Sequence, residues 1–295
     1  MSNNIKIAVD AMGGDNSPDK VIKGIIHHSS LNQNVFYKIF GEEVKINRCI
    51  NNKLNKNNYQ IINTNKKVSS EDSPLEGAKR GKDTSMWLAI ESVKSKDCDI
   101  VISAGNTGAL LVISKLNLKM IENIDKPALS ALWPNKRGMS VVLDLGANIE
   151  CSSKDLFDFS IMGASLYKSL YSDETPQVAL LNIGSEELKG KEVIKETYKI
   201  LKEKKSSYYD FKGYIEGNEL MHGNVNVIVS DGFTGNVALK TAEGTANFIT
   251  DELKKTFTET IFGKLSAFIN LKNIKKFKDK LDPRLYNGAI LLGLD

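Results

Sequence analysis

The stretch IKIAVDAMGGD, residues 5–15, decides the fold class that the sequence predicts. Its first part, Ile5–Asp10, is rich in apolar and β-branched residues and predicts a strand. A loop of small and acidic residues follows, and a helical pattern begins near Pro18. The same order of strand, polar loop and helix recurs along the chain, with further strands expected at residues 35–40, 59–62, 99–103, 140–144, 177–181, 211–215 and 225–229.

Strands that alternate with helices predict right-handed crossovers and an α/β fold, a three-layer, doubly wound and mostly parallel sheet. The run Ile100-Val101-Ile102 is continuously apolar, which predicts a strand buried on both faces. In this topology every strand-to-helix loop leaves the same edge of the sheet. We therefore expect the polar loops to converge on one crevice.

No Pro- or Ser-rich linker divides the chain, so we expect one continuous domain over residues 1–295. Within it, residues 248–280 are expected to form a helical projection. Residues 261, 265, 268 and 269 place Ile, Leu, Phe and Ile on one face of a helix, and a cluster of lysines follows at residues 272–280. This face suits reversible attachment to an anionic membrane, and equally a dimer interface or a core helix.

The composition indicates a folded globular protein, with 41% hydrophobic and 26% charged residues. A formal net charge of +4 over 295 residues does not indicate a nucleic-acid partner. No apolar run approaches the roughly 18 residues of a membrane span, and the N-terminus has no signal-peptide pattern. The sequence has three cysteines, Cys49, Cys98 and Cys151, and they lack the paired spacing of zinc or redox sites. We therefore expect the protein to be located in a reducing cytoplasm.

The loops that end the predicted strands share Gly, Asn, Asp, Thr and Ser. Glycine lets backbone N–H groups approach a ligand closely, and a helix N-terminus offers unpaired donors to an anion. Thr107 and Asn236 also stand where N-cap residues belong. For each loop taken singly, a purely structural role in capping a helix is therefore as good an explanation as ligand binding. Several such loops at one edge together predict a site for a phosphate-bearing ligand.

Several familiar catalytic motifs are missing. Residues 184–191 resemble a Walker loop but contain one residue too many, and no G-x-G-x-x-G or G-x-S-x-G sequence occurs. We expect Cys151 to be a bystander, and no metal or cofactor is expected. The sequence has only three histidines that could serve as a base for a serine or cysteine nucleophile: His27, His28 and His222. Serine- or cysteine-based covalent catalysis is therefore not expected.

Six motifs carry a resemblance to a known family. They are DAMGGD at residues 10–15, SAGNTG at 103–108, LDLGAN at 143–148, NIG at 182–184 with LKG at 188–190, DGFTGN at 231–236 and LDPRLYNG at 281–288. In this order and spacing the chain resembles the acyl-carrier-protein-dependent phosphate acyltransferases of bacterial phospholipid synthesis, the PlsX family.

The resemblance implies that acyl-acyl-carrier-protein and inorganic phosphate react to give acyl phosphate and free carrier protein. It implies a fold similar to phosphotransacetylases and isocitrate dehydrogenases, a homodimer, and a cytoplasmic protein loosely associated with the membrane surface. The product would feed a membrane glycerol-phosphate acyltransferase, as the first step towards phosphatidic acid. The family continues past Asp295 with a strand and a helix, which we expect this chain to lack.

With this resemblance, three residues are the catalytic candidates. Asn106 would stabilise the oxyanion, Lys189 would neutralise phosphate or the oxyanion, and Asp231 would orient Lys189 or Lys240, or else cap a helix. The remaining candidates would bind substrate: Asp10, Gly13, Gly14, Asp15, Ser103, Gly105, Thr107, Gly108, Asn148, Asn182, Gly235, Asn236 and Lys240.

Two other readings stay open. A phosphotransacetylase-like enzyme would use acyl-coenzyme A, and a recognition pocket for its nucleotide would favour that donor. A non-catalytic phosphate-ligand sensor or scaffold would show no turnover of acyl phosphate. An oxidoreductase like isocitrate dehydrogenase is disfavoured, because neither a metal-binding aspartate cluster nor a dinucleotide fingerprint is present in the sequence.

Overall fold

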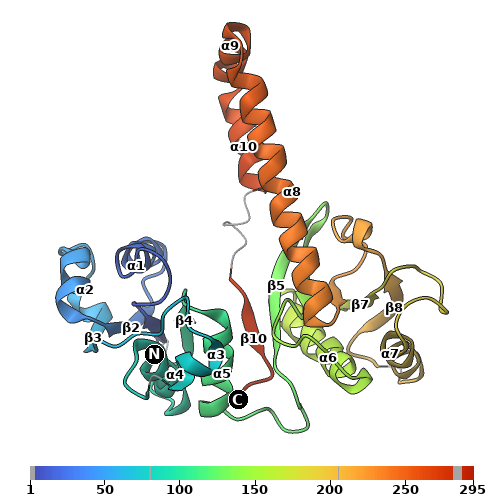
Figure 1. Ribbon diagram of the computed structural model, residues 1–295, viewed down its shortest axis with the longest axis horizontal. Helices are drawn as coiled ribbons and strands as arrows, with labels where there is room; N and C mark the ends of the chain where they lie inside the picture. The colour runs from blue at the N-terminus through green and yellow to red at the C-terminus, as the bar shows by residue number, and fades with distance from the viewer. Residues whose placement is uncertain (1–3, 80, 205, 282–287) are drawn as a thin grey trace. The chain divides into compact units, whose positions relative to one another are not determined.

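The computed structural model describes residues 4–79, 81–204, 206–281 and 288–295. Where the sequence predicts one continuous domain, the described chain forms two compact units. Unit 1 comprises Met1–Ile121 with Leu294–Asp295, and unit 2 comprises Glu122–Gly293. Each unit has a sheet of its own (Figure 1). The predicted α/β class with mostly parallel strands is confirmed in both.

Unit 1 is built on a four-stranded parallel sheet of order β3-β2-β1-β4. Alternate residues of β1 face opposite layers: Ile7 and Val9 pack with α1 and α2, whereas Ala8 packs on the face that α4 covers. The strands are β1 (Ile5–Asp10), β2 (Val35–Gly41), β3 (Tyr59–Asn63) and β4 (Ile100–Ser103). The helices are α1 (Asp19–Leu31), α2 (Glu43–Ile50), η1 (Lys56–Asn58), α3 (Pro74–Lys79), α4 (Ser85–Lys94) and α5 (Thr107–Asn117).

The expectation that β4 is buried on both faces is wrong. Ile100 and Ile102 are each 49% exposed, while Val101 packs on the α4 side. β4 is an edge strand of its sheet, and the face that carries Ile102 borders a cavity. A continuous apolar run therefore marks a strand here without full burial.

Unit 2 is built on a six-stranded sheet of order β10-β5-β6-β9-β7-β8. The last four strands in this order are parallel, and β5 runs antiparallel to both of its neighbours. α6 and α7 cover one face, and the first part of α8 packs on the other. The strands are β5 (Ala128–Asn135), β6 (Gly138–Leu143), β7 (Gln177–Leu181), β8 (Asp210–Ile215), β9 (Val227–Val229) and β10 (Ile290–Leu292). The helices are α6 (Ser153–Leu170), α7 (Glu192–Glu203), η2 (Gly217–Glu219), α8 (Gly232–Thr258), α9 (Ile261–Ile269) and α10 (Leu271–Leu281).

The predicted helical segment 248–280 consists of the outer half of α8, then α9 and α10. Figure 1 shows α8 running away from the sheet of unit 2, α9 at its far end, and α10 returning beside α8. The predicted apolar face of α9 is well exposed, from 56% for Leu265 to 84% for Ile261. No helix in the described part of the chain is both long enough and apolar enough to cross a bilayer.

Packing of α6 on the sheet of unit 2 requires a glycine at residue 163. A Cβ atom there would lie 2.6 Å from Val227 Cγ1 and 2.8 Å from Leu143 Cδ2. We expect Gly163→Val to lower the free energy of unfolding by about 1–3 kcal/mol, because the core is overpacked. The matched control is Gly244→Val on α8, where a Cβ would meet no atom within 4 Å. Urea denaturation measures both, and equal effects would contradict this account of the packing.

Candidate functional site

In unit 1 the polar loops after β1 and β4 emerge side by side. The two strands are adjacent and parallel, and Asp10 pairs in register with Ser103. Asp10 is 1% exposed; its Oδ2 accepts a hydrogen bond from Ser103 Oγ at 2.7 Å, and its Oδ1 accepts one from Met12 N at 3.2 Å. Gly105 N in turn donates to Ser103 Oγ at 3.1 Å. The buried carboxylate thus ties the two loops together.

Two glycines let these loops touch through their backbones. A Cβ at Gly13 would lie 2.6 Å from Asp10 Oδ2 and 2.7 Å from Gly105 N. Gly14 has φ +81°, and a Cβ there would overlap the carbonyl oxygen of Ala104. No side chain fits at either position, which explains why the sequence has glycine here.

The Asn106 side chain holds its surroundings in place. It is the N-cap of α5, with Oδ1 accepting from Ala109 N at 3.0 Å, and its Nδ2 donates to the carbonyl oxygens of Asp72 at 2.8 Å and Ser70 at 3.3 Å. Thr107, expected at a cap position, is instead the first residue of the helix. A Cβ at Gly108 would lie 2.7 Å from Pro74 Cγ, so this turn too is closely packed.

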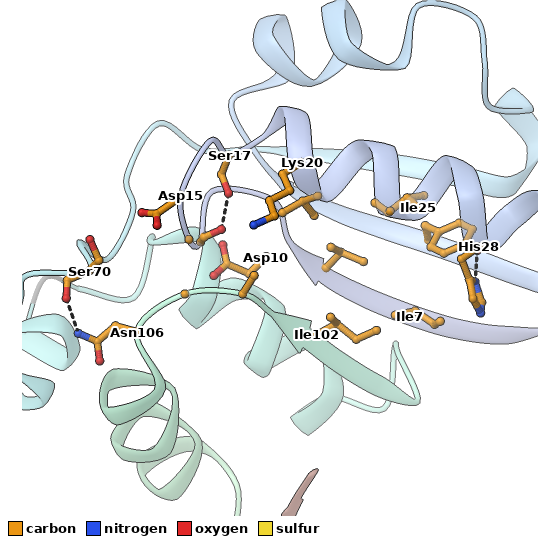
Figure 2. A pocket seen from close by; sticks show the side chains of 18 residues that line it. Ile7, Asp10, Asp15, Ser17, Lys20, Ile25, His28, Ser70, Ile102 and Asn106 are labelled. Carbon is orange, nitrogen blue, oxygen red and sulfur yellow. Dashed lines mark hydrogen bonds between the residues drawn. The ribbon is translucent and has the colours of Figure 1, made fainter. Parts of the chain in front are cut away.

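A cavity of about 600 Å³ in unit 1 opens at these loops. Figure 2 shows its polar end, where Asp10, Asp15 and Asn106 lie near two residues that the sequence analysis missed, Ser17 and Lys20. Ser17 Oγ donates to the carbonyl oxygen of Gly13, and the Lys20 side chain points toward this end. The signal for both was their position at the start of the helix that follows the glycine loop.

In unit 2 a second buried carboxylate organises the loop after β6. Asp144 is 0% exposed and accepts hydrogen bonds from four backbone N–H groups, those of residues 129, 146, 147 and 148, at 2.7–3.2 Å. The Asn148 side chain donates to Asp144 Oδ2 at 2.8 Å and to the carbonyl oxygen of Pro127 at 2.7 Å. The Asn148 amide, a predicted substrate donor, is therefore already engaged within the unit.

The N-terminus of α8 packs against this loop. Asp231 is the N-cap: its Oδ1 accepts from Thr234 N at 2.7 Å, so the capping alternative is confirmed. Its lysine partner is Lys191, with Nζ 3.3 Å from Oδ2. The expectation that it orients Lys189 or Lys240 is wrong, because Lys240 Nζ lies 2.8 Å from Glu243 Oε2 and Lys189 pairs with another acid.

The neighbouring glycine and asparagine of α8 differ in surroundings. A Cβ at Gly235 would overlap the carbonyl oxygen of Asp144, so α8 meets the β6 loop backbone to backbone. Asn236 is exposed within the helix and is not its cap.

Lys189 lies in the loop between β7 and α7 and is exposed. Its Nζ is 2.8 Å from Glu186 Oε1, and this hydrogen bond raises the pKa of Lys189, so the side chain stays protonated at neutral pH. Asn182 Nδ2 donates to the carbonyl oxygens of Lys189 and Gly184, each at 3.1 Å. Asn182 therefore orders the loop that carries the lysine.

The structure thus gathers the candidates into two sets. Nine residues of the sequence-predicted site lie around the loops of unit 1, and seven lie in unit 2, at the loops after β6 and β7 and in the first part of α8 with its N-cap. That both sets form one crevice stays a prediction. Residues 282–287 of the motif LDPRLYNG lie outside the described residues.

Comparison with known proteins identifies the family. The profile of the family described as "Fatty acid synthesis protein" matches residues 5–295. The chain belongs to this family. It is 71% identical over 295 residues to the phosphate acyltransferase of Pelagibacter ubique (strain HTCC1062), covering 100% of this chain and 88% of that protein. It is 41% identical to the phosphate acyltransferase of Caulobacter vibrioides, covering 100% of this chain and 82% of that one. The resemblance drawn from the motifs is confirmed.

The fold of this fatty acid synthesis protein is similar to that of solved phosphotransacetylases. EutD phosphotransacetylase from Staphylococcus aureus superimposes with a TM-score of 0.60 at 15% identity, over 83% of each chain. A phosphotransacetylase from Streptococcus pyogenes gives 0.61 at 15% identity, again over 83% of each chain. The expected likeness to the phosphotransacetylase fold is confirmed.

Cys151 follows the Asn148 loop of this family member and is half-buried. Burial raises the pKa of the Cys151 thiol to about 12, and the nearby Asp144 carboxylate adds to the shift. A thiol with this pKa is protonated at neutral pH and is a poor nucleophile, which agrees with a bystander role.

Asn106 offers a sharp test of the unit 1 loops. We expect Asn106→Ala to lower the rate of acyl transfer to phosphate, the activity for which the relatives are named, by about a hundredfold, because the loop of residues 103–108 loses the support of the Asn106 amide and a small displacement of reacting groups costs about that factor. Asn106→Ser keeps an acceptor for Ala109 N but removes both amide N–H donors, so it separates helix capping from the contacts of Nδ2. Steady-state kinetics of the two variants decides, with circular dichroism as the control for folding. Wild-type rates in both would place the reaction at other loops.

Proposed function

We propose that this protein transfers an acyl group from acyl-acyl-carrier-protein to inorganic phosphate, giving acyl phosphate and free carrier protein. The observation that carries the proposal is the backbone contact between the glycine loops of residues 10–15 and 103–108, at the carboxyl end of β1 and β4. Loops of this kind present N–H groups to an anion. The 71% identity to a phosphate acyltransferase over the whole chain supports the same conclusion.

The chemistry needs few protein groups. A phosphate oxygen attacks the thioester carbonyl carbon, the C–S bond breaks, and the thiolate leaves with the carrier protein and takes up a proton. Phosphate is already an anionic nucleophile, so the protein must hold it next to the carbonyl and stabilise the developing oxyanion. No covalent enzyme intermediate is required.

The N–H groups of Gly13, Gly14 and residues 106–108 are the donors in this proposal, since Gly105 N–H already donates to Ser103 Oγ. They are held in place before substrate arrives, because Asp10 and Ser103 fix both loops. In unit 2, Lys189 is the proposed source of positive charge for an anionic ligand, and its raised pKa keeps it charged. Donors that need no rearrangement at the moment of reaction are the most effective kind.

We further infer a homodimer that works in the cytoplasm at the membrane surface and passes acyl phosphate to a membrane glycerol-phosphate acyltransferase. The exposed apolar residues of α9 support the membrane part of this proposal. Ile261, Phe262, Leu265, Phe268 and Ile269 are each more than half exposed. The exposed lysines of α10 begin directly after them, and each can contribute about 1 kcal/mol of attraction to an anionic bilayer.

The choice of acyl donor tests the reaction. Acyl-acyl-carrier-protein should support acyl phosphate formation, trapped with hydroxylamine, only when phosphate is present. Acyl-coenzyme A should react at least about tenfold more slowly, because it lacks the contacts that the carrier protein makes with the enzyme. The loss of one interface hot spot of about 2 kcal/mol alone corresponds to more than a tenfold loss of affinity. Equal rates with the two donors would exclude dependence on the carrier protein and favour a phosphotransacetylase.

Flotation with liposomes tests the membrane contact. Binding should be stronger to anionic than to neutral vesicles and should weaken as salt rises, because salt screens exposed charges over about 10 Å at 0.1 M. Leu265→Glu should abolish binding without changing the oligomeric state. The matched control, Thr256→Glu, adds the same charge to an exposed polar position of α8 and should still bind. Loss of the dimer in Leu265→Glu would identify the face as a subunit interface.

A further inference from the structure

The cavity of unit 1 extends beyond the polar loops. Figure 2 shows that its other end has a different character, with Ile7, Ile25 and Ile102 along its walls and His28 at its limit. Val9 and Val21 complete the apolar wall. The volume of about 600 Å³ lies within the range of about 300–1,000 Å³ that is usual for small-molecule sites.

The apolar end follows from the way α1 packs on the sheet. Ile7 and Val9 point from β1 toward the helix, and Val21 and Ile25 stand one turn apart on the facing side of α1. Ile102 lies on the edge strand and is 49% exposed. A row of apolar side chains thus borders open space.

Gly24 keeps this space open. It lines the cavity from α1, one turn before His28, and a Cβ atom built there would meet no atom within 4 Å. Any larger residue at this position would project into the space beside the helix without first colliding with the protein. The local backbone does not need glycine here, since α1 is a regular helix and Gly24 has no positive φ.

The far end is bordered by a polar pair. His28 Nδ1 lies 2.6 Å from Tyr37 Oη, and their rings meet edge to face. Tyr37 is 2% exposed, so its ring is held firmly by β2 and the core of the unit. The cavity therefore runs from backbone N–H groups at one end, along an apolar wall, to a hydrogen-bonded pair at the other.

We propose that the apolar end of this cavity holds the hydrocarbon chain of the acyl group, with the acyl carbonyl at the glycine loops and the methyl end directed toward His28 and Tyr37. This inference rests on the proposed function. The walls between the two ends are apolar, which suits methylene groups and does not suit the amide-rich arm of a carrier protein. Each methylene that enters contributes about fourfold in affinity.

The test is the dependence of the reaction on chain length. For octanoyl, dodecanoyl and hexadecanoyl carrier protein, kcat/KM is measured for the wild type, for Gly24→Phe and for the control His27→Phe. His27 lies on the same helix, is exposed and does not line the cavity. The ratio of hexadecanoyl to octanoyl kcat/KM should fall by about tenfold or more in Gly24→Phe alone, since only a few methylenes need to be excluded for that loss. An unchanged ratio, or the same fall in both variants, would overturn the inference.

Direct binding separates this inference from the proposed function. Calorimetry with hexadecylphosphonate and octylphosphonate, which carry an anionic head and a chain but no reactive carbonyl, needs no turnover. Tighter binding of the longer chain, lost in Gly24→Phe and kept in His27→Phe, supports the pocket even if the wild type makes no acyl phosphate. Equal affinities for the two chains would overturn it while the acyl transfer stands. If Gly24→Phe does not fold, Ile102→Phe at the half-exposed wall makes the same test.

Discussion

A carboxylate buried at the carboxyl end of a strand is the feature on which the rest of the structure depends. Asp10 ends β1 in unit 1, and Asp144 directly follows β6 in unit 2. Burial of a charged carboxylate is costly unless hydrogen bonds replace its water, and both groups meet this condition by accepting from loop N–H and side-chain donors. The loops cannot move away without leaving the carboxylate unsatisfied, so they are held against each other.

This constraint explains why side-chain amides support the loops while backbone N–H groups are offered to a ligand. The amides of Asn106, Asn148 and Asn182 donate to carbonyl oxygens or a carboxylate within their own units. They act as supports for the loops they stand on. In the proposed site an anion would therefore meet backbone N–H groups of the glycine loops, where a Cβ at Gly13 or Gly14 would collide with the neighbouring loop. Donors fixed in this way stabilise charge without a cost of reorganisation during the reaction.

The same strands that fix the polar loops also form the apolar cavity. Residues of β1 alternate between the layers, so Ile7 and Val9 line the side of α1 while Asp10 ends the strand at the loop edge. Because β4 is the edge strand and Ile102 is 49% exposed, the apolar surface there remains open. The polar loops and the apolar wall thus lie next to each other, which is the arrangement that the proposed binding of an acyl chain requires.

The sequence by itself was sufficient for features that depend on local geometry. The order of strands and helices, the glycine loops at strand ends and the helices of residues 248–280 follow from side-chain periodicity and from the conformations open to glycine, and β7 is observed at the predicted residues 177–181. The motif order was sufficient for the family.

Contacts between distant segments were decided only by the tertiary structure. These include β5 and β10, which are strands because they pair antiparallel with one another, and the partner of Asp231, which is Lys191. They also include the exposure of Ile102, which depends on its edge position and not on its neighbours in sequence. Local patterns restrict φ, ψ and periodicity residue by residue, whereas pairing and burial depend on which surfaces meet when the whole chain has folded.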